Sequence, residues 1–363
     1  MPRALTLTKI EGAKPGEVYY PIQIKDVPKP KPGPGEVLVR LTAAALNHRD
    51  YFIRRHQYPA ISFTNALLAD GYGTVIETGP DVKRTNLLNK NVVLLPLRGW
   101  DSDPNAPEDV TKYGVIGSTT LNDAGTAQDY IVVSEDDVEP APSHLTPAEA
   151  AALPLAGLTA WRAFKTKSDS ASPGKNILIT GIGGGVALQA LQFAVAAGCN
   201  VYVTSGDQQK IDKAKEMGAK DGVIYKGELW GKDLQKLLPK DRPYIDAVID
   251  GAGGKIIYKT GRLLKPGGVI VQYGMTVGPK MDWAMPAVLN WTELRGTSMG
   301  SRREFREMLT FVAKTKIRPV VFRTVKGLSN LPAIEGLFEE MSKGSQFGKL
   351  VIEIGNEDDG AKL

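Results

Sequence analysis

The segment KNILITGIGGGVALQALQFAVAAGCNVYVTS, residues 175–205, decides the predicted fold of this chain. Its apolar, β-branched beginning at 175–180 indicates a buried strand. A helical run at 186–197, ended by Gly198, leads into a second strand at 200–205. A strand, a helix and a strand within about 30 residues form the βαβ unit that a dinucleotide-binding motif requires.

A glycine-rich turn joins the first strand to the helix. Glycines bring bare backbone N–H groups and the helix N-terminus close to a phosphate. The turn therefore predicts a dinucleotide site, and the alternative is a turn that serves only close packing of helix against sheet. The predicted phosphate-binding residues are Gly181, Gly183, Gly184, Gly185 and Val186.

The composition is that of a globular protein with little scope for disulfides. Of 363 residues, 42% are hydrophobic and 23% are charged, and the length favours two domains. Cys199 is the single cysteine, which excludes an intramolecular disulfide and a cysteine-rich zinc site and suits a reducing compartment. The basic residues behind the net charge of +5 are dispersed, which argues against a nucleic-acid partner.

Membrane and targeting signals in the sequence are weak. No run of about 18 apolar residues occurs, so we expect no transmembrane helix and no membrane partner. Residues 1–14 lack the apolar core of a signal peptide. The tripeptide Ala361-Lys362-Leu363 resembles the peroxisomal SKL address, with alanine in place of serine. We predict a cytoplasmic location, with the peroxisome as the alternative.

The composition and the pattern of predicted strands and helices along the chain predict two domains. Residues 1–155 are rich in proline, glycine and short β-type runs, which indicates a β-rich, barrel-like domain. Residues 156–300 alternate strands and helices, which predicts an α/β domain with a doubly wound parallel sheet. Residues 301–363 start with an amphipathic helix and contain an apolar strand at 349–354 that we expect to return to the first domain.

Individual elements follow from the same patterns. One helix is predicted at 145–164, with Thr146 as N-cap and Pro147 in its first turn. Another is predicted at 255–264, before a strand at 268–274. The segment 98–122 is polar and irregular. The other predicted strands begin near residue 36 and lie at 71–79, 89–97, 127–142, 221–226, 244–250 and 293–299, and a further helix lies at 207–217.

The second strand of the βαβ unit ends without an acidic residue. In doubly wound nucleotide folds an Asp or Glu at this position binds the ribose 2′-hydroxyl and selects NAD. Here the strand ends at Ser205, and the nearby Asp207 is better explained as the N-cap of the next helix. Ser205 is suited to hydrogen-bond a 2′-phosphate, and Lys210 to meet its charge. This pattern predicts NADPH, in preference to NADH, as cofactor.

The order of these features resembles the medium-chain dehydrogenase/reductase superfamily over nearly the whole chain. The motifs that carry the resemblance are AALPLAGLTAW, the glycine turn, TSGDQQKIDKAKEMGA and IDGAGG. GIGGGVA, with Gly181, Gly184 and Ala187 at the key positions, is similar to the turn of the zinc-independent quinone-oxidoreductase branch. The resemblance implies a Rossmann NADP-binding domain and a GroES-like catalytic domain with a partly open barrel for the two predicted domains.

The resemblance also implies cofactor contacts outside the glycine turn, and a homodimer, since family members often pair the edge strands of their nucleotide domains. Thr159 matches a threonine that touches the nicotinamide, and Tyr225 joins Ser205 and Lys210 around the 2′-phosphate. The loops along the dinucleotide are matched by IDGAGG and QYGMTVG, which contain Gly251, Gly274 and Met275.

Zinc alcohol dehydrogenases of the same superfamily are the competing class. Their catalytic zinc needs Cys or His ligands at set positions. Asn47 stands where the resemblance places a cysteine ligand, and Ala69 stands where it places a histidine. The structural-zinc lobe needs four cysteines, and His48 has no partner at ligand spacing. We therefore predict no zinc.

Loss of zinc bears on the substrate, because a plain ketone needs stronger polarisation than a quinone or an enone. Asn47 and His48 are the predicted donors to a developing oxyanion, and Tyr51 and Tyr58 are predicted donors or stacking walls. The sequence thus predicts an NADPH-dependent reductase of quinones or α,β-unsaturated carbonyls. The alternatives are a metal-free carbonyl or alcohol dehydrogenase, and an NADPH-binding sensor or scaffold with little turnover.

Overall fold

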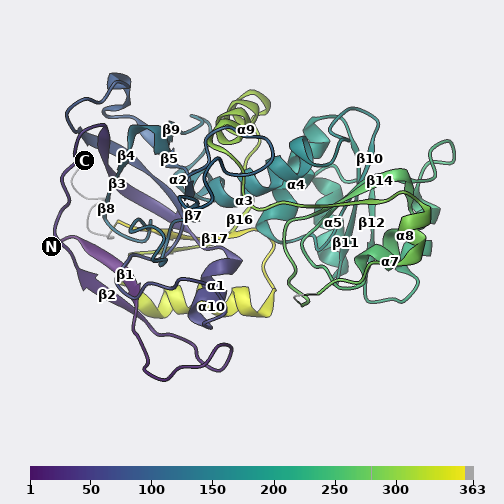
Figure 1. Cartoon of the computed structure of the whole chain (residues 1–363), viewed down its shortest axis with the longest axis horizontal. Helices are drawn as coiled ribbons and strands as arrows, with labels where there is room; N and C mark the ends of the chain where they lie inside the picture. The colour runs from purple at the N-terminus through teal and green to yellow at the C-terminus, as the bar shows by residue number, and fades with distance from the viewer. Residues whose placement is uncertain (279, 356–363) are drawn as a thin grey trace. The chain divides into compact units, whose positions relative to one another are not determined.

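The computed structural model describes residues 1–278 and 280–355, which fall into two compact units (Figure 1). The first unit is Met1–Leu155 together with the chain from Ser301 onward, and the second unit is Ala156–Gly300. Within the described ranges, no helix has both the length and the apolar composition needed to cross a bilayer.

The second unit is built on a six-stranded, entirely parallel sheet in the order β12-β11-β10-β13-β14-β15. The chain starts in the middle of the sheet at β10, moves to one edge and then crosses to the other, which is the Rossmann order. Its strands are β10 Asn176–Ile179, β11 Asn200–Ser205, β12 Asp221–Ile224, β13 Ile245–Asp250, β14 Leu264–Gln272 and β15 Glu293–Gly296. Its helices include α4 Gly185–Ala196, α5 Gln208–Glu216, α6 Trp230–Leu237, α7 Ile256–Thr260 and α8 Met285–Leu289.

The first unit is built on a mixed seven-stranded sheet in the order β16-β17-β3-β4-β5-β9, with β8 also paired to β3. These strands are β3 Glu36–Ala45, β4 Asp70–Thr78, β5 Asn91–Leu94, β8 Tyr130–Ser134, β9 Val138–Pro140, β16 Val321–Lys326 and β17 Lys349–Glu353. Two small sheets pair β1 Arg3–Leu7 with β2 Ile22–Asp26, and β6 Leu97–Arg98 with β7 Gly114–Val115. The helices are α1 His48–Arg54, α2 Pro147–Ala151, α9 Arg302–Thr315 and α10 Leu331–Lys343, and α3 Pro154–Trp161 leads into the second unit.

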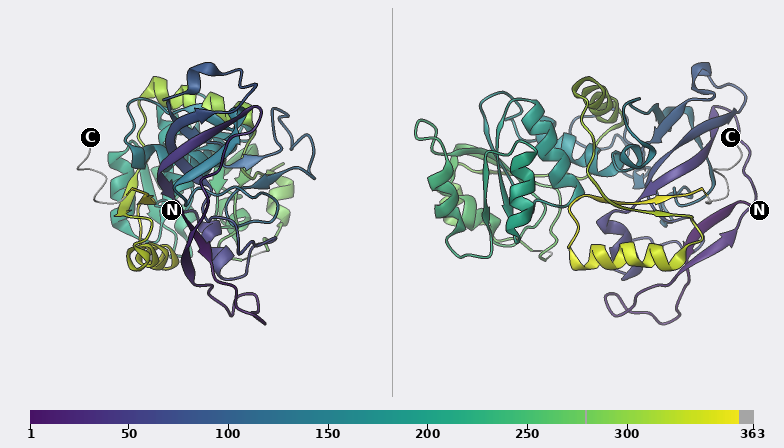
Figure 2. Two further views of the ribbon diagram at one scale, coloured as in Figure 1. Left: turned by 90° about the vertical axis from the view of Figure 1, so that its left-hand side faces the viewer. Right: turned by 180° about the vertical axis from the view of Figure 1, so that it is seen from behind.

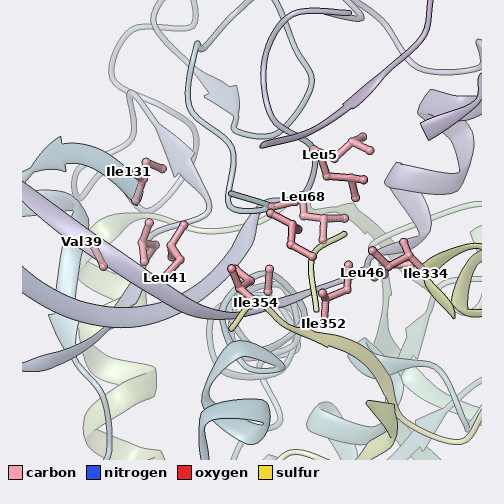
Figure 3. Close-up of a cluster of buried hydrophobic side chains, with 14 of the residues drawn as sticks. Leu5, Val39, Leu41, Leu46, Leu68, Ile131, Ile334, Ile352 and Ile354 are labelled. Atoms are coloured by element: carbon pink, nitrogen blue, oxygen red, sulfur yellow. The ribbon is translucent and has the colours of Figure 1, made fainter. Parts of the chain in front are cut away.

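The returning strand predicted near the C-terminus is present as β17, which pairs antiparallel with β3. The core that encloses it includes Leu5, Leu46, Leu68, Ile334 and Ile352 (Figure 3). Helix α10 lies alongside α1 in both sets of views (Figures 1 and 2), and Arg54 makes a bidentate ion pair with Glu335 there. The C-terminal segment is therefore an integral part of the first unit.

Two helix predictions were wrong in extent. The helix predicted at 145–164 is divided into α2 and α3, because Pro154 has no N–H to donate and disfavours helical geometry in the residue before it. It then continues as one π-helical turn, Arg162–Thr166. The helix predicted at 255–264 is only α7, and β14 starts at Leu264, four residues before the predicted strand. The Thr146 cap is confirmed, since its side chain accepts from the Glu149 amide.

Candidate active site

A buried polar cluster of three side chains lies beside the N-terminus of α1. Lys349 Nζ donates to Asn47 Oδ1 at 2.6 Å and to Asp70 Oδ2 at 2.9 Å, and Asn47 Nδ2 donates to Asp70 Oδ2 at 2.8 Å. Asn47 is 7% exposed, Asp70 0% and Lys349 5%. The backbone amide of Leu155 donates to the other carboxylate oxygen of Asp70 at 2.7 Å, so both oxygens of this buried anion are hydrogen-bonded.

The strand register brings the cluster together. Ala45, the last residue of β3, pairs with Asp70 on one side and with Val351 on the other. The starts of β4 and β17 therefore flank the point where β3 leads into α1. Asn47 and Lys349 are 302 residues apart in the chain, and they meet only because β17 returns to this sheet.

A second ion pair is buried next to the first. Arg49 Nη1 lies 3.1 Å from Asp50 Oδ1, and Asp50 Oδ2 accepts from the backbone amide of Asn47 at 2.7 Å. Burial raises the pKa of Asp50, against the lowering effect of the Arg49 guanidinium. Arg49 also donates to the carbonyls of Ile116 and Gly117, at 2.9 and 3.0 Å. This arginine thus anchors part of the polar segment 98–122 to α1.

The other predicted catalytic side chains belong to α1, for His48 and Tyr51, or follow it by a few residues, for Tyr58. His48 is exposed, yet the protein atoms around it partly desolvate the imidazole and lower its pKa, so the ring is neutral at pH 7. Tyr51 is half-buried with its ring 5.9 Å from that of His48. Tyr58 is also half-buried, and its ring lies 4.8 Å from the Arg49 guanidinium carbon. The structure therefore groups Asn47, His48 and Tyr51 closely, and connects Tyr58 to them through Arg49.

The donor atoms of this region do not fit a zinc ion. Zinc in proteins is held by thiolate, imidazole and carboxylate groups. Across residues 1–278 and 280–355, no group of three or more such side chains is placed to hold a metal. The centre of the Asn47 cluster is instead taken by the Lys349 ammonium, which would repel a second cation.

In the second unit, the predicted glycine turn lies at the N-terminus of α4 and has backbone torsions that favour glycine. Gly181 and Gly183 have φ of +62° and +127°, where a side chain would be strained. A Cβ added to Gly181 or Gly184 would meet no heavy atom within 4 Å, so open space adjoins the turn. Gly184 is the N-cap of α4, whose first-turn N–H groups, including those of Gly185 and Val186, have no acceptor within the helix.

The two loops predicted to lie along the dinucleotide meet at the carboxyl ends of β13 and β14. Asp250 accepts hydrogen bonds from Thr180 Oγ1 and from Gln272 Nε2. A Cβ on Gly251 would lie 2.5 Å from the Tyr273 ring, so only glycine permits this approach. Gly274 packs on Gly251, and Met275 lies beside Gly253 in the same place. The predicted contacts Gly251, Gly274 and Met275 therefore share one edge of the sheet.

The tip of β11 gathers the residues predicted around a 2′-phosphate. Ser205 is buried, and its carbonyl accepts from the Tyr225 amide at 3.0 Å. The Tyr225 hydroxyl lies 2.9 Å from where a Cβ on Gly206 would be. Asp207 caps α5 by accepting from the Gln209 amide at 2.9 Å, as predicted. Lys210 follows in the first turn of α5, and burial lowers its pKa.

Thr159 and Lys349 each make a side-chain contact far along the chain that their local sequence does not indicate. Thr159 is buried on α3, and its Oγ1 donates to Met299 Sδ at 3.7 Å. The sequence pattern at 349–354 predicts an apolar strand and gives Lys349 no role of its own. The available signal was a lysine opening the run KLVIEI, where a buried strand otherwise has apolar residues.

Known proteins resemble the chain over nearly its whole length. A family model described as alcohol dehydrogenase GroES-like domain matches residues 33–143, and one described as zinc-binding dehydrogenase matches residues 185–314. A zinc-type alcohol dehydrogenase-like protein, YogA, from Leptosphaeria maculans is 57% identical over 359 residues, covering 98% of this chain and all 100% of that protein.

More distant relatives also match the chain over most of its length. The zinc-type alcohol dehydrogenase-like protein C1773.06c of Schizosaccharomyces pombe is 31% identical over 337 residues, covering 91% of this chain and 93% of that protein. The crystal structure of an NAD-dependent alcohol dehydrogenase superposes with a TM-score of 0.83 at 29% identity, covering 98% of this chain and 100% of that one. The fold of these enzymes implies a nicotinamide cofactor. With a GroES-like first unit and a Rossmann-like second unit, the chain belongs to the medium-chain dehydrogenase/reductase superfamily of oxidoreductases.

Proposed function

We propose that this oxidoreductase is a zinc-independent, NADPH-dependent reductase of quinones or α,β-unsaturated carbonyls. The observation that carries the proposal is the Lys349 ammonium, hydrogen-bonded to Asn47 and Asp70 where relatives of the zinc class would place a metal ligand. A fixed ammonium group with a neutral amide polarises a substrate carbonyl less strongly than a metal ion acting as a Lewis acid. Substrates that are already activated acceptors suit that arrangement best.

The first unit supplies the groups for the substrate oxygen. The Asn47 amide is the proposed donor, and His48, neutral at pH 7, can donate a ring N–H. Tyr51 and Tyr58 are proposed to line the substrate site as flat, half-buried rings. In this proposal the final proton comes from water, so the four side chains bind and orient the substrate and none of them has to act as an acid.

The second unit supplies the groups for the cofactor, which provides the hydride when bound. The glycine turn at Gly181–Gly185 and Val186 would hold the pyrophosphate, and the loops with Gly251, Gly274 and Met275 would border the nicotinamide half. Thr159 is proposed to contact the nicotinamide.

The preference for NADPH rests on the tip of β11. One oxygen of the Asp207 carboxylate, which lies next to this tip, accepts from the Gln209 amide as the cap of α5. Ser205, Lys210 and Tyr225 surround the position with a hydroxyl, a cation and a phenol. One solved relative is named as NAD-dependent, so the proposed preference for NADPH comes from these residues and not from the family.

A second candidate is a metal-free alcohol or carbonyl dehydrogenase, because several relatives carry the name alcohol dehydrogenase. The test is NADPH oxidation with a quinone, an enone and a simple aldehyde, with the metal content of the same sample measured. Turnover of quinone or enone by zinc-free protein supports the proposal. Turnover confined to the aldehyde, or activity in proportion to bound zinc, would overturn it. Tight NADPH binding without turnover of any substrate would favour the sensor or scaffold alternative.

We also propose a homodimer formed through the edge strand β15 of the second unit. Among the described residues, strand β15 pairs with β14 alone, so its other edge is available to a second copy. Large apolar side chains are exposed around it, namely Trp283, Met285, Val288, Leu289, Trp291 and Leu294. Trp291→Glu should yield a monomer in sedimentation velocity, whereas Val110→Glu, at an exposed site of the first unit, should not. A wild-type monomer would refute the proposal.

The proposed location is cytoplasmic or peroxisomal. The tripeptide Ala361-Lys362-Leu363 lies outside the described residues and rests on the sequence alone. A fluorescent fusion with and without these three residues distinguishes the two: loss of punctate signal on deletion supports the peroxisome, and identical diffuse signal supports the cytoplasm.

A further inference from the structure

The hydrogen bonds around Asn47 determine which way its amide points. Its oxygen faces the Lys349 ammonium at 2.6 Å, and its nitrogen faces the Asp70 carboxylate at 2.8 Å. The flipped amide would set an NH2 group against an ammonium and a carbonyl against a carboxylate, so both contacts would be repulsive. The charges of the Lys349–Asp70 pair thus allow only one orientation.

That orientation leaves one donor of Asn47 for another molecule. The amide nitrogen carries two hydrogens, and in the described part of the chain only the bond to Asp70 uses one. A cation on the carbonyl oxygen draws electrons through the amide and makes the remaining N–H a stronger donor. The two hydrogen bonds hold the side chain in place, and because Asn47 is 7% exposed it is not completely shielded from solvent.

We propose that Lys349 is a positioning residue that, with Asp70, holds Asn47 as the N–H donor to the substrate's carbonyl oxygen. This inference rests on the proposed reductase function and specifies how its oxyanion is stabilised. When hydride adds to the β-carbon of an enone, the C=C electron pair moves to form an enolate and negative charge collects on oxygen. The oriented N–H stabilises that charge, and a proton from water then restores the neutral product.

The variants are chosen so that loss of folding does not decide the outcome. Asn47→Ala removes the donor itself. Lys349→Met leaves Asp70 buried without its counter-ion, so the double variant Asp70→Asn with Lys349→Met is made as well, because it removes both charges together. Lys343→Met is the matched control, since it removes an exposed lysine from α10.

Steady-state kinetics on an enone give the first measurement. Asn47→Ala should lower kcat and kcat/KM by the same factor, about 10²–10³, because the bond is made mainly in the transition state. The double variant should lower both about 10-fold or more while its NADPH dissociation constant stays at the wild-type value. A double variant that folds and keeps wild-type kcat would overturn the role of Lys349, whatever happens in Asn47→Ala.

A binding measurement separates this inference from the proposed function. 4-Nitrophenol carries an oxyanion when ionised, and donors to its oxygen lower the pKa of the bound phenol. Titration of its absorbance should show that lowering in wild type and in Lys343→Met, less of it in the double variant and least in Asn47→Ala. An equal lowering in all four proteins would refute the inference. Absence of enone turnover by wild type would instead refute the proposed function, and leaves this titration interpretable.

Discussion

Replacing Lys210 with alanine should weaken the binding of NADPH far more than that of NADH. The two cofactors differ only in the 2′-phosphate, which carries a charge of about −1.5 to −2 at pH 7. Lys210 lies in the first turn of α5, directly after the tip of β11, and Asp207 beside it is engaged as the helix cap. The substitution therefore removes an attraction that only the phosphorylated cofactor experiences.

The size of the effect follows from the burial of the lysine. A hydrogen bond to a charged group contributes about 1.5–3 kcal/mol. Because Lys210 is only half-buried, water screens part of the interaction, and the lower half of that range applies. A loss of about 1.5–2 kcal/mol raises the NADPH dissociation constant about 13- to 30-fold, at 1.36 kcal/mol for each tenfold change.

Calorimetric titration of both cofactors into wild type and two variants measures this directly. The control is Lys220→Ala, which removes an exposed lysine at the opposite, amino end of β12. We expect the control to bind both cofactors as wild type does. Higher ionic strength should reduce the NADPH advantage of wild type, and should have little effect on the Lys210 variant.

The pH dependence adds an independent check. Burial lowers the pKa of Lys210 in the free protein, and a bound phosphate would raise it again. The protonated lysine therefore binds NADPH preferentially, so NADPH affinity should fall as pH rises through the pKa of Lys210 while NADH affinity stays level. Equal losses of both cofactors in Lys210→Ala, or parallel pH profiles, would refute the 2′-phosphate assignment.

Three further predictions concern stability and reactivity. Burial alone would raise the pKa of Asp246, but hydrogen bonds, including those from Arg242, outweigh it, so the pKa is lowered. The ionised Asp246 therefore stabilises the fold at pH 7, and this stabilisation is lost as the pH falls through the lowered pKa. Asp246→Asn should accordingly lose about 1.5–3 kcal/mol in urea unfolding at pH 7, and this difference should shrink in acid. Gly73→Ala should lose about 1–3 kcal/mol, because its Cβ would lie 2.2 Å from a carbonyl oxygen of β3, whereas Gly296→Ala, with no atom within 4 Å, should lose much less. Burial raises the pKa of the Cys199 thiol to about 11, so a disulfide reagent at pH 8 should label native protein far more slowly than unfolded protein, and fast native labelling would contradict its burial.

The βαβ unit could be predicted almost to the residue because its signals are local. The apolar run, the glycine turn and the glycine at position 198 each act within a few residues, and β11 spans 200–205 as predicted. The helix predicted at 145–164 failed for an equally local reason, since Pro154 interrupts an otherwise helical pattern. Strands such as β1 and helices such as α10 were missed because their stability comes from packing against distant parts of the chain.

The candidate site shows the same division. Asn47 and His48 could be singled out as neighbours in a motif, and the residues around Ser205 as neighbours at a strand end. Lys349 could not, because nothing in its local sequence points to a partner 302 positions away. Its contact with Asn47 exists only through the register that places β17 against β3.

Comparison of the buried carboxylates of Asp246 and Asp70 shows why the pair of Asp70 and Lys349 points to function and not simply to stability. Asp246 is contacted by Arg242, Lys175 and Lys265, all partly exposed cations, so its ion pairs avoid much of the cost of burial. Asp70 and Lys349 are both almost completely buried, where the desolvation penalty can match or exceed the attraction. Replacing such a pair by neutral groups is often tolerated. Asp246→Asn should therefore reduce stability and leave kcat unchanged. The neutral double variant at Asp70 and Lys349 should retain most of its stability and have a lower kcat. A double variant that loses stability and keeps its kcat would mean that the Lys349–Asp70 pair serves the fold alone.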